Sequence, residues 1–177
     1  SEAEAAVKRL IELDPQNTFA KTSLAEILAV QGRYDDGLQM NEQVLQTDPS
    51  NIEAMYGMIS ITDMKGNPDV GIKAIQELYN KDTTNGNAAS VLAETQFSRD
   101  EHEAAYKTVE DALKQSPTNA ALLSSGAKIA AAQGNYAQSA EWAEKAAAAK
   151  SVRSPSQSSG EVEESAGGAE SAPGVGI

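Results

Sequence analysis

The chain has 177 residues, enough for one or two ordinary domains that bury a core without disulfides or a structural metal. Its 14 Lys and Arg against 26 Asp and Glu give a formal net charge of -12, which argues against nucleic acid or anionic lipid as partners and favours basic or neutral ones. With no cysteine and one histidine, His102, the sequence lacks a thiolate nucleophile and any pair of Cys or His metal ligands, so we expect no metal and no cofactor.

No apolar run approaches the ~18 residues of a membrane span, and residues 1–10 mix acidic and basic side chains instead of forming a signal peptide. The sequence therefore predicts a soluble chain without membrane insertion. The compartment stays open, with the cytoplasm slightly favoured and a periplasmic or other lumenal location as the alternative. Because the sequence starts at Ser1 and not at methionine, we expect a processed product or a fragment of a longer chain.

Turn-forming residues recur along the chain with a period of 34. Asparagine marks each unit, and proline precedes it by two places in three units, with Thr83 at the vacant place. A second series, of glycine, lies halfway through the units, with Asp100 at its vacant place. Two independent turn markers that share one period predict two helices per unit. The asparagines are Asn17, Asn51, Asn85 and Asn119, and the glycines are Gly32, Gly66 and Gly134.

The two markers predict two kinds of joint. The X-Pro steps between units disfavour helix and supply polar caps, so one helix is expected to end and the next to begin around them. These steps are Asp14-Pro15, Asp48-Pro49 and Ser116-Pro117. Each glycine suits a tight turn with a positive φ between the two helices of a unit. In the second full unit, Asn67 is expected to cap the new helix, with Pro68 in its first turn.

The first element, residues 1–17, corresponds to the second half of a unit and has no partner helix before it. Its apolar side chains, Val7, Leu10, Ile11 and Leu13, are expected to form an exposed face. Either the natural chain continues N-terminally with the missing helix, or this surface self-associates. The half-unit also motivates another functional class, a regulatory or targeting arm of a larger enzyme whose catalytic domain lies N-terminal to this chain.

Full units follow at residues 18–51, 52–85 and 86–119. The terminal repeat, residues 120–150, is alanine-rich and offers little apolar area to a further unit, so we expect the array to end there. From residues 151–177 the composition changes to Ser, Gly, Glu, Ala and Pro. Such a segment cannot bury enough apolar surface to offset its ordering entropy, and a disordered tail is expected.

The residues at the packing positions of these units resemble the tetratricopeptide repeat (TPR) family, which places small residues where its two helices approach closely. The matching residues are Leu24, Ala25, Leu28, Tyr34, Gly37, Val44 and Pro49; Met58, Pro68, Gly71 and Leu78; Leu92, Ala93, His102, Ala105, Ala112 and Pro117; and Ala127, Tyr136, Ser139 and Ala146. The sequence departs from the family at Ile59, where a small residue is usual, and at Lys21 and Ala89, where a large one is usual. The resemblance implies an all-α, right-handed α-solenoid of antiparallel helix hairpins.

The sequence has few of the motifs that are typical of enzymes. It has no phosphate-binding glycine loop, no nucleophile elbow and no metal-ligand spacing, so we expect a non-enzymatic protein. His102 takes the place that Tyr34 and Tyr136 hold in other units and is expected to pack and cap at the start of a helix. Trp142 is expected to pack while partly exposed, with anchoring of a partner as the alternative.

In the TPR family, the first helix of each unit lines the concave surface. Its positions here form an acidic trough with aromatic rings, which suits a basic or neutral peptide segment or helix of a partner; the alternative is a merely solvated polar face. The candidate binding residues are Phe19, Thr22 and Glu26; Glu53, Tyr56, Ser60 and Asp63; Asn87, Ser90, Glu94 and Phe97; and Ser124 and Lys128.

One branch of the family, the co-chaperones, clamps an acidic C-terminal carboxylate with Lys, Arg and Asn on this face. The corresponding positions here are Thr22, Glu26, Ser60 and Glu94, and only Lys128 has the required charge. Ser, Thr and Glu do not make the charge-assisted bonds that such a carboxylate needs, so an acidic chaperone tail is disfavoured. The resemblance therefore implies a protein-protein interaction module or scaffold for other partners.

Overall fold

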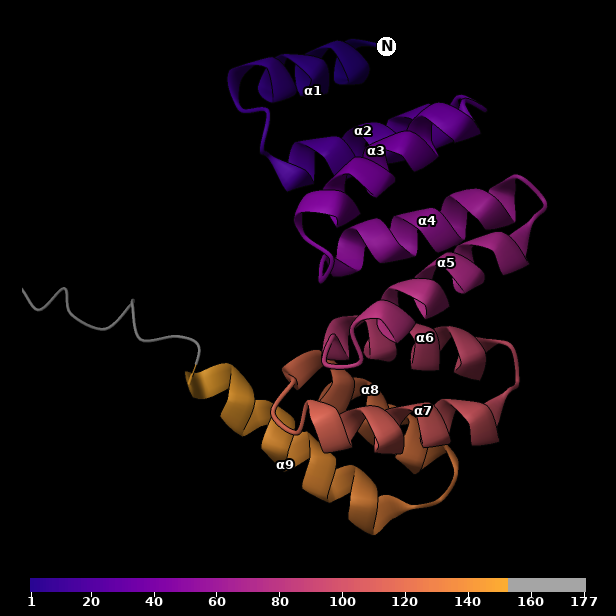
Figure 1. The fold of residues 1–177 in the computed structure, drawn as a ribbon, viewed down its shortest axis with the longest axis vertical. Coiled ribbons are helices and arrows are strands. Elements are labelled where there is room, and N and C mark those ends of the chain that lie inside the picture. Colours follow the sequence, from indigo (N-terminus) through magenta and orange to yellow (C-terminus); the bar gives the residue numbers. More distant parts are fainter. Residues whose placement is uncertain (153–177) are drawn as a thin grey trace, which may run out of the picture.

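A computed structural model describes residues 1–152, which form nine α-helices and no strand. The helices are α1 (Glu2–Leu13), α2 (Thr18–Val30), α3 (Tyr34–Thr47), α4 (Ile52–Met64), α5 (Pro68–Lys81), α6 (Gly86–Ser98), α7 (His102–Gln115), α8 (Ala120–Ala132) and α9 (Tyr136–Val152). Successive helix pairs follow one another along the long axis of the molecule, with α1 at one end and α9 at the other (Figure 1). The all-α solenoid of antiparallel helix hairpins is confirmed.

The tail expected over residues 151–177 lies almost wholly outside the described residues. Ser151 and Val152 are the last two residues of α9, so the helix runs slightly past the expected end of the terminal repeat. Alanine has the highest intrinsic helix propensity of any residue type, so the alanine run of α9 favours this continuation.

The helices form two layers. Within a unit the two helices pack as a hairpin, and the second helix also contacts the first helix of the next unit. The first helices, α2, α4, α6 and α8, contact one another in succession and form one continuous row. Side chains on the free face of this row are therefore brought to a common surface, whereas those between neighbouring helices become buried.

The asparagine series caps the first helix of every full unit. In each case the side-chain oxygen accepts a hydrogen bond from the backbone N–H three residues later, at 2.8 to 3.0 Å. The caps are Asn17 for α2, Asn51 for α4, Asn85 for α6 and Asn119 for α8. The X-Pro steps separate the helices as expected, but Asp14, Asp48 and Ser116 end the preceding helices and the side-chain caps come from asparagine. An N-cap requirement thus explains the 34-residue asparagine period.

The turns inside the units have the expected backbone. Gly32, Gly66 and Gly134 have φ values of 77°, 81° and 80°, and Asp100 takes the same left-handed conformation with φ 64°. Pro68 lies in the first turn of α5, as expected. Asn67 occupies the N-cap position of α5, as expected, but its side chain makes no capping hydrogen bond, and its backbone N–H is bonded to Thr62 O of α4.

Two close contacts accommodate unusual residues in the core. A Cβ atom at Gly71 would lie 2.8 Å from Ile59 Cα, so the glycine lets α5 approach α4 although Ile59 stands where a small residue is usual. Gly126 leaves similar room for Trp142, whose Cε3 would lie 2.9 Å from a Cβ there. Trp142 is only 6% exposed and its ring lies 5.6 Å from that of Tyr106. The expectation of a partly exposed tryptophan is wrong, because this side chain is buried.

His102 is the first residue of α7, and its ring lies 4.7 Å from that of Phe97. The packing role is confirmed, but the N-cap position belongs to Glu101, so the expected capping role is wrong.

The core between the first two full units contains a polar residue, Asn41 of α3, which is 1% exposed and packs against Gly57 of α4. Both polar atoms of its amide are buried without a hydrogen-bond partner among the described residues.

None of the helices in the described part of the chain combines the length and hydrophobicity that crossing a bilayer requires.

Candidate protein-binding groove

The first helices of the first two full units enclose a hollow of about 480 Å³ on their common surface. We call it the α2–α4 hollow. It is lined by Glu26, Ala29 and Val30 from α2 and by Glu53, Tyr56, Gly57, Ser60, Ile61 and Met64 from α4. Four of the predicted binding residues, Glu26, Glu53, Tyr56 and Ser60, are thus brought together at one place.

Apolar side chains are exposed at this hollow. Val30 is 81% exposed, Met64 46% and Tyr56 38%, whereas Ala29 and Ile61 form the buried floor beneath them. Sequence reasoning missed Val30 and Met64, because each lies beyond the last residue assigned to the concave face of its helix, Glu26 in α2 and Asp63 in α4. The available signal was a large apolar residue at the last position of a helix, immediately before a polar turn.

The acidic side chains of the groove differ in their surroundings. Glu26, Glu53 and Asp63 are exposed, and within residues 1–152 they make no ion pair. Glu94 of α6 lies 3.6 Å from Lys128 Nζ of α8. The acidic character predicted for the whole groove is therefore concentrated on α2 and α4.

The carboxylate of Glu94 is bound by side chains from the two neighbouring units of the solenoid. It accepts hydrogen bonds from the Tyr56 phenol of α4 and, at 2.5 Å, from Ser125 Oγ of α8. Ser125 Oγ in turn lies 2.7 Å from Ser90 Oγ. Burial alone would raise the pKa of Glu94, but the hydrogen bonds from Ser125 and Tyr56 and the charge of Lys128 outweigh it and lower the pKa. Burial, together with the neighbouring Glu94, raises the pKa of the Tyr56 phenol, which therefore stays a donor.

Two predicted binding residues are not on the surface. Thr22 is 8% exposed, with its hydroxyl donating to Phe19 O at 3.1 Å, and Ser90 is 4% exposed beside Ser125. These positions face the neighbouring helix, because the first helices of successive units contact one another. The prediction that Thr22 and Ser90 belong to the binding surface is therefore wrong, because both side chains are buried.

The remaining predicted residues lie outside the hollow. Phe19 is 75% exposed near the start of α2, and Asp63 and Lys128 are exposed. Three others are half-buried and engaged in structural contacts. Asn87 Nδ2 donates to Ser50 O at 2.8 Å, Phe97 packs on the C-terminal core, and Ser124 Oγ donates to Ala120 O at 2.7 Å.

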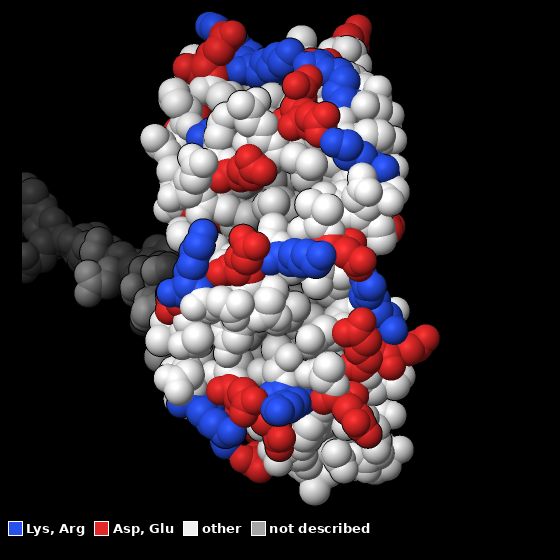
Figure 2. Space-filling model, turned by 45° about the vertical axis from the view of Figure 1, so that its right-hand side comes forward, with Lys and Arg blue, Asp and Glu red and all other residues white. Residues whose placement is uncertain are grey.

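A series of polar contacts joins successive units along the edge that carries the turns inside the units. Lys65 pairs with Asp35, Arg99 Nη2 lies 2.9 Å from Asp69 Oδ1, and Gln133 Nε2 donates to His102 O at 2.8 Å. Figure 2 turns this edge forward and shows acidic and basic side chains adjacent to one another at several levels, with uncharged surface between them. Exposed pairs of this kind contribute about 0 to 1 kcal/mol each, so they favour a regular stacking without forming a site of one charge.

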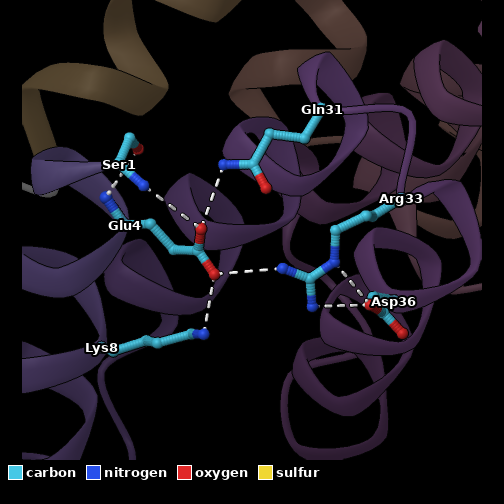
Figure 3. A network of polar contacts seen from close by, with 6 residues as sticks. All are labelled: Ser1, Glu4, Lys8, Gln31, Arg33 and Asp36. Carbon is cyan, nitrogen blue, oxygen red and sulfur yellow. Dashed lines mark hydrogen bonds and ion pairs between the residues drawn. The ribbon is translucent and has the colours of Figure 1, made fainter.

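The same series begins at Glu4 of α1 (Figure 3). Its carboxylate pairs with Lys8 at 2.7 Å and with Arg33 at 3.1 Å, and it accepts a hydrogen bond from Gln31 Nε2 at 3.0 Å. These contacts, with Lys8 and Gln31 the largest, lower the pKa of Glu4 to about 2. Glu4 thus connects the half-unit α1 to the turn between α2 and α3.

Among residues 1–152, no group of three or more His, Asp or Glu side chains converges on a point where a metal ion could bind. A second hollow, of about 620 Å³, lies at the C-terminal end and is lined by Pro117, Thr118, Leu123, Lys145, Ala148 and Ala149. Its one charged side chain, Lys145, is paired with Glu141 at 2.6 Å, so it offers few polar groups to a ligand.

The capped helix hairpins, their shared row of first helices and the groove on that row define a tetratricopeptide-repeat solenoid. Solved structures with this fold are similar at low identity. MamA is 20% identical, with a TM-score of 0.51, over 85% of this chain and 88% of that one. A tetratricopeptide repeat protein from Parabacteroides merdae is 19% identical, with a TM-score of 0.55, over 82% and 57%. TTC0263, a thermophilic TPR protein in Thermus thermophilus, is 21% identical, with a TM-score of 0.50, over 76% and 75%.

The sequence also matches a family model. The match covers residues 5–160 and is to the ChAPs family, the Chs5p-Arf1p-binding proteins. The chain belongs to this family. Comparison with curated proteins finds no match.

Proposed function

We propose that this chain is a non-enzymatic interaction scaffold that binds a segment of a partner protein in the groove of its first helices, centred on the α2–α4 hollow. The observation that carries the proposal is the exposure of Val30, Met64 and Tyr56 around a single hollow that also contains Glu26 and Glu53. Exposed apolar side chains gathered at one place and rimmed by polar ones are typical of protein-binding surfaces. The family name, which describes proteins that bind Chs5p and Arf1p, supports protein partners for this chain as well.

The charge of the groove favours a basic or neutral segment. Glu26, Glu53 and Asp63 are exposed, and the one basic residue of the predicted groove, Lys128, lies beside Glu94. A cationic segment would be attracted during encounter and would be favoured over an acidic one in the complex. We expect an extended or helical segment that lies along the row of first helices.

Site-specific photo-crosslinking tests this proposal. A photoreactive benzoylphenylalanine is placed at Ser60, which is exposed and lines the hollow, and in a control protein at Gln46, which is exposed on α3. The first partners to test are counterparts of the two proteins in the family name, followed by proteins captured from native lysate. The proposal expects adducts from Ser60 and few from Gln46.

Charge reversal gives an independent readout. Glu26→Lys with Glu53→Lys is expected to abolish the Ser60 adduct, whereas Glu42→Lys with Glu77→Lys, on α3 and α5, should leave it intact. Both double variants change the net charge equally and alter exposed carboxylates. Equal crosslinking from Ser60 and Gln46, unaffected by either pair of substitutions, would contradict a binding site in the groove.

A further inference from the structure

We infer that the α2–α4 hollow is a subsite for an arginine side chain of the partner segment, beside one apolar side chain of the same segment. This inference rests on the proposed function and narrows it to a chemical class of ligand. It rests on three features of the hollow: its two glutamates, its apolar floor and the position of the Tyr56 ring.

Two carboxylates approach the hollow from different helices. Glu26 comes from α2 and Glu53 from α4, and both are exposed. An arginine guanidinium has five N–H donors in a planar fork, so one group can bond to carboxylates on two sides at once. A lysine ammonium is a compact and strongly hydrated charge that matches such an arrangement less well.

The floor and wall of the hollow suit the rest of an arginine side chain. Ala29 and Ile61 are 3% and 2% exposed and form an apolar floor on which the methylene stem can lie. Tyr56 supplies an aromatic wall, and its hydroxyl already donates to Glu94. What Tyr56 offers to a ligand is therefore its ring, against which a guanidinium stacks favourably.

The hollow holds more than one side chain. Its volume of about 480 Å³ lies within the usual range for small-ligand pockets, about 300 to 1,000 Å³. Val30 and Met64, at the ends of α2 and α4, are the most exposed apolar residues that line it. Covering both would remove apolar surface from water, which an apolar residue near the arginine in the partner can do.

A hollow of about 390 Å³, lined mainly by the second helices α3 and α5, provides a matched comparison. It also contains two glutamates, Glu42 and Glu77, but it includes Lys81 as well and has no aromatic residue. If carboxylates alone attracted arginine, both hollows would do so. The inference expects only the α2–α4 hollow to bind it.

The test begins with a display library of random peptides of about twelve residues, selected against the full chain. Peptides selected by the wild-type protein should be enriched in arginine close to an apolar residue. A synthetic peptide from this set, its arginine-to-citrulline analogue and its arginine-to-lysine analogue are then titrated by fluorescence anisotropy. Citrulline keeps the shape of arginine without its charge, and we expect it to weaken binding about tenfold or more. Lysine should weaken binding about threefold or more, because its compact and strongly hydrated ammonium lacks the planar fork of donors and does not stack on the Tyr56 ring as a guanidinium does.

Protein variants locate the effect. Glu26→Gln with Glu53→Gln should weaken the arginine peptide about tenfold and leave the citrulline peptide unchanged, whereas Glu42→Gln with Glu77→Gln should stay within about twofold of the wild type. Circular dichroism of each variant checks that the helices are intact.

The outcomes separate this inference from the proposed function. Equal affinity for the arginine and citrulline peptides, or equal loss from both pairs of glutamates, would overturn the arginine subsite. Equal affinity for the arginine and lysine peptides would overturn the choice of arginine over a general cation. If the selected peptide still crosslinks to a photoreactive group at Ser60 in these cases, the proposed function stands. If no peptide is selected, or none crosslinks at Ser60, both proposals fail.

Discussion

Tyr56 in α4 donates a hydrogen bond from its phenol to the carboxylate of Glu94 in α6, 38 residues further along the chain. The same carboxylate meets Ser125 and Lys128 of α8. The ring that lines the α2–α4 hollow is therefore positioned by residues of two further units. Because the carboxylate is the common acceptor, its ionisation state connects the stacking of the units to the shape of the groove.

Replacing Glu94 tests this connection. Glu94→Gln is expected to lower the free energy of unfolding near neutral pH by about 1 to 2 kcal/mol, because it removes the charge from the shared acceptor. The pKa of Glu94 is lowered in the folded protein, so its ionised form stabilises the fold above the ordinary glutamate pKa of 4.5 and loses this effect as the pH falls through the lowered value. Urea unfolding at neutral pH and at about pH 3 measures the difference, which should shrink in acid. A difference that is the same at both pH values would contradict the assignment.

The buried amide of Asn41 predicts a stabilising substitution. Asn41→Leu keeps the branched shape of the side chain and removes two polar atoms that are buried without a partner, so we expect the free energy of unfolding to rise by about 1 to 2 kcal/mol. For a chain of this size that corresponds to a melting temperature higher by about 2 to 8 °C. Thermal unfolding followed by circular dichroism gives the measurement.

A second buried asparagine is the matched control. Asn85 is 8% exposed, but its side chain accepts from Ala88 N and donates to Pro49 O at 2.7 Å. Asn85→Leu should therefore destabilise the protein by about 1 to 2 kcal/mol. If both substitutions shift the melting temperature in the same direction, the absence of partners at Asn41 is not what distinguishes the two sites.

Much of the fold could be predicted because its determinants are local. Capping and positive-φ turns depend on a few neighbouring residues, so the asparagine and glycine series indicate helix ends directly from the sequence. The vacant place at Asp100 illustrates this, since an aspartate there takes the left-handed conformation of the glycines. Aspartate tolerates this conformation better than most residues do, which makes the exception chemically reasonable.

The groove was predicted less completely because it depends on contacts between units. Helical spacing places Ser90 and Glu94 on the same face, yet Ser90 is buried against α8 and Glu94 is engaged by Ser125 and Lys128. Neither outcome follows from spacing within one helix, since both require the distance to the next unit. The same reason explains Trp142, whose burial depends on the missing side chain of Gly126 in the partner helix.

The turn at Asp100 allows a direct test of its backbone conformation. Asp100 has a φ of 64°. Asp100→Ala should lower the free energy of unfolding by about 1 kcal/mol, because alanine has no polar side chain that could form a local hydrogen bond in the left-handed conformation. Asp100→Gly should be at least as stable as the wild type, since glycine adopts this conformation without strain. Urea unfolding of the three proteins gives the order. If the alanine variant is as stable as the glycine variant, backbone strain does not determine stability at this turn.

The open face of α1 predicts self-association. Leu10 and Leu13 are 48% and 69% exposed, and none of the side chains of α1 is buried in the described part of the chain. Since exposed leucines on one helix favour burial against another surface, we expect the mean mass by light scattering to rise with protein concentration. Leu10→Ser with Leu13→Ser should keep the chain monomeric over the same range.

The control is Val70→Ser on α5, which removes an apolar side chain of comparable exposure, 56%, from a helix in the middle of the array. It should associate as the wild type does, because the expected contact involves α1. A wild-type mass that stays constant on dilution would contradict the prediction of self-association through residues 1–17. A mass that rises equally in all three proteins would assign association to another surface. In that case the apolar hollow around Leu123 and Ala148 at the C-terminal end would be the next surface to alter.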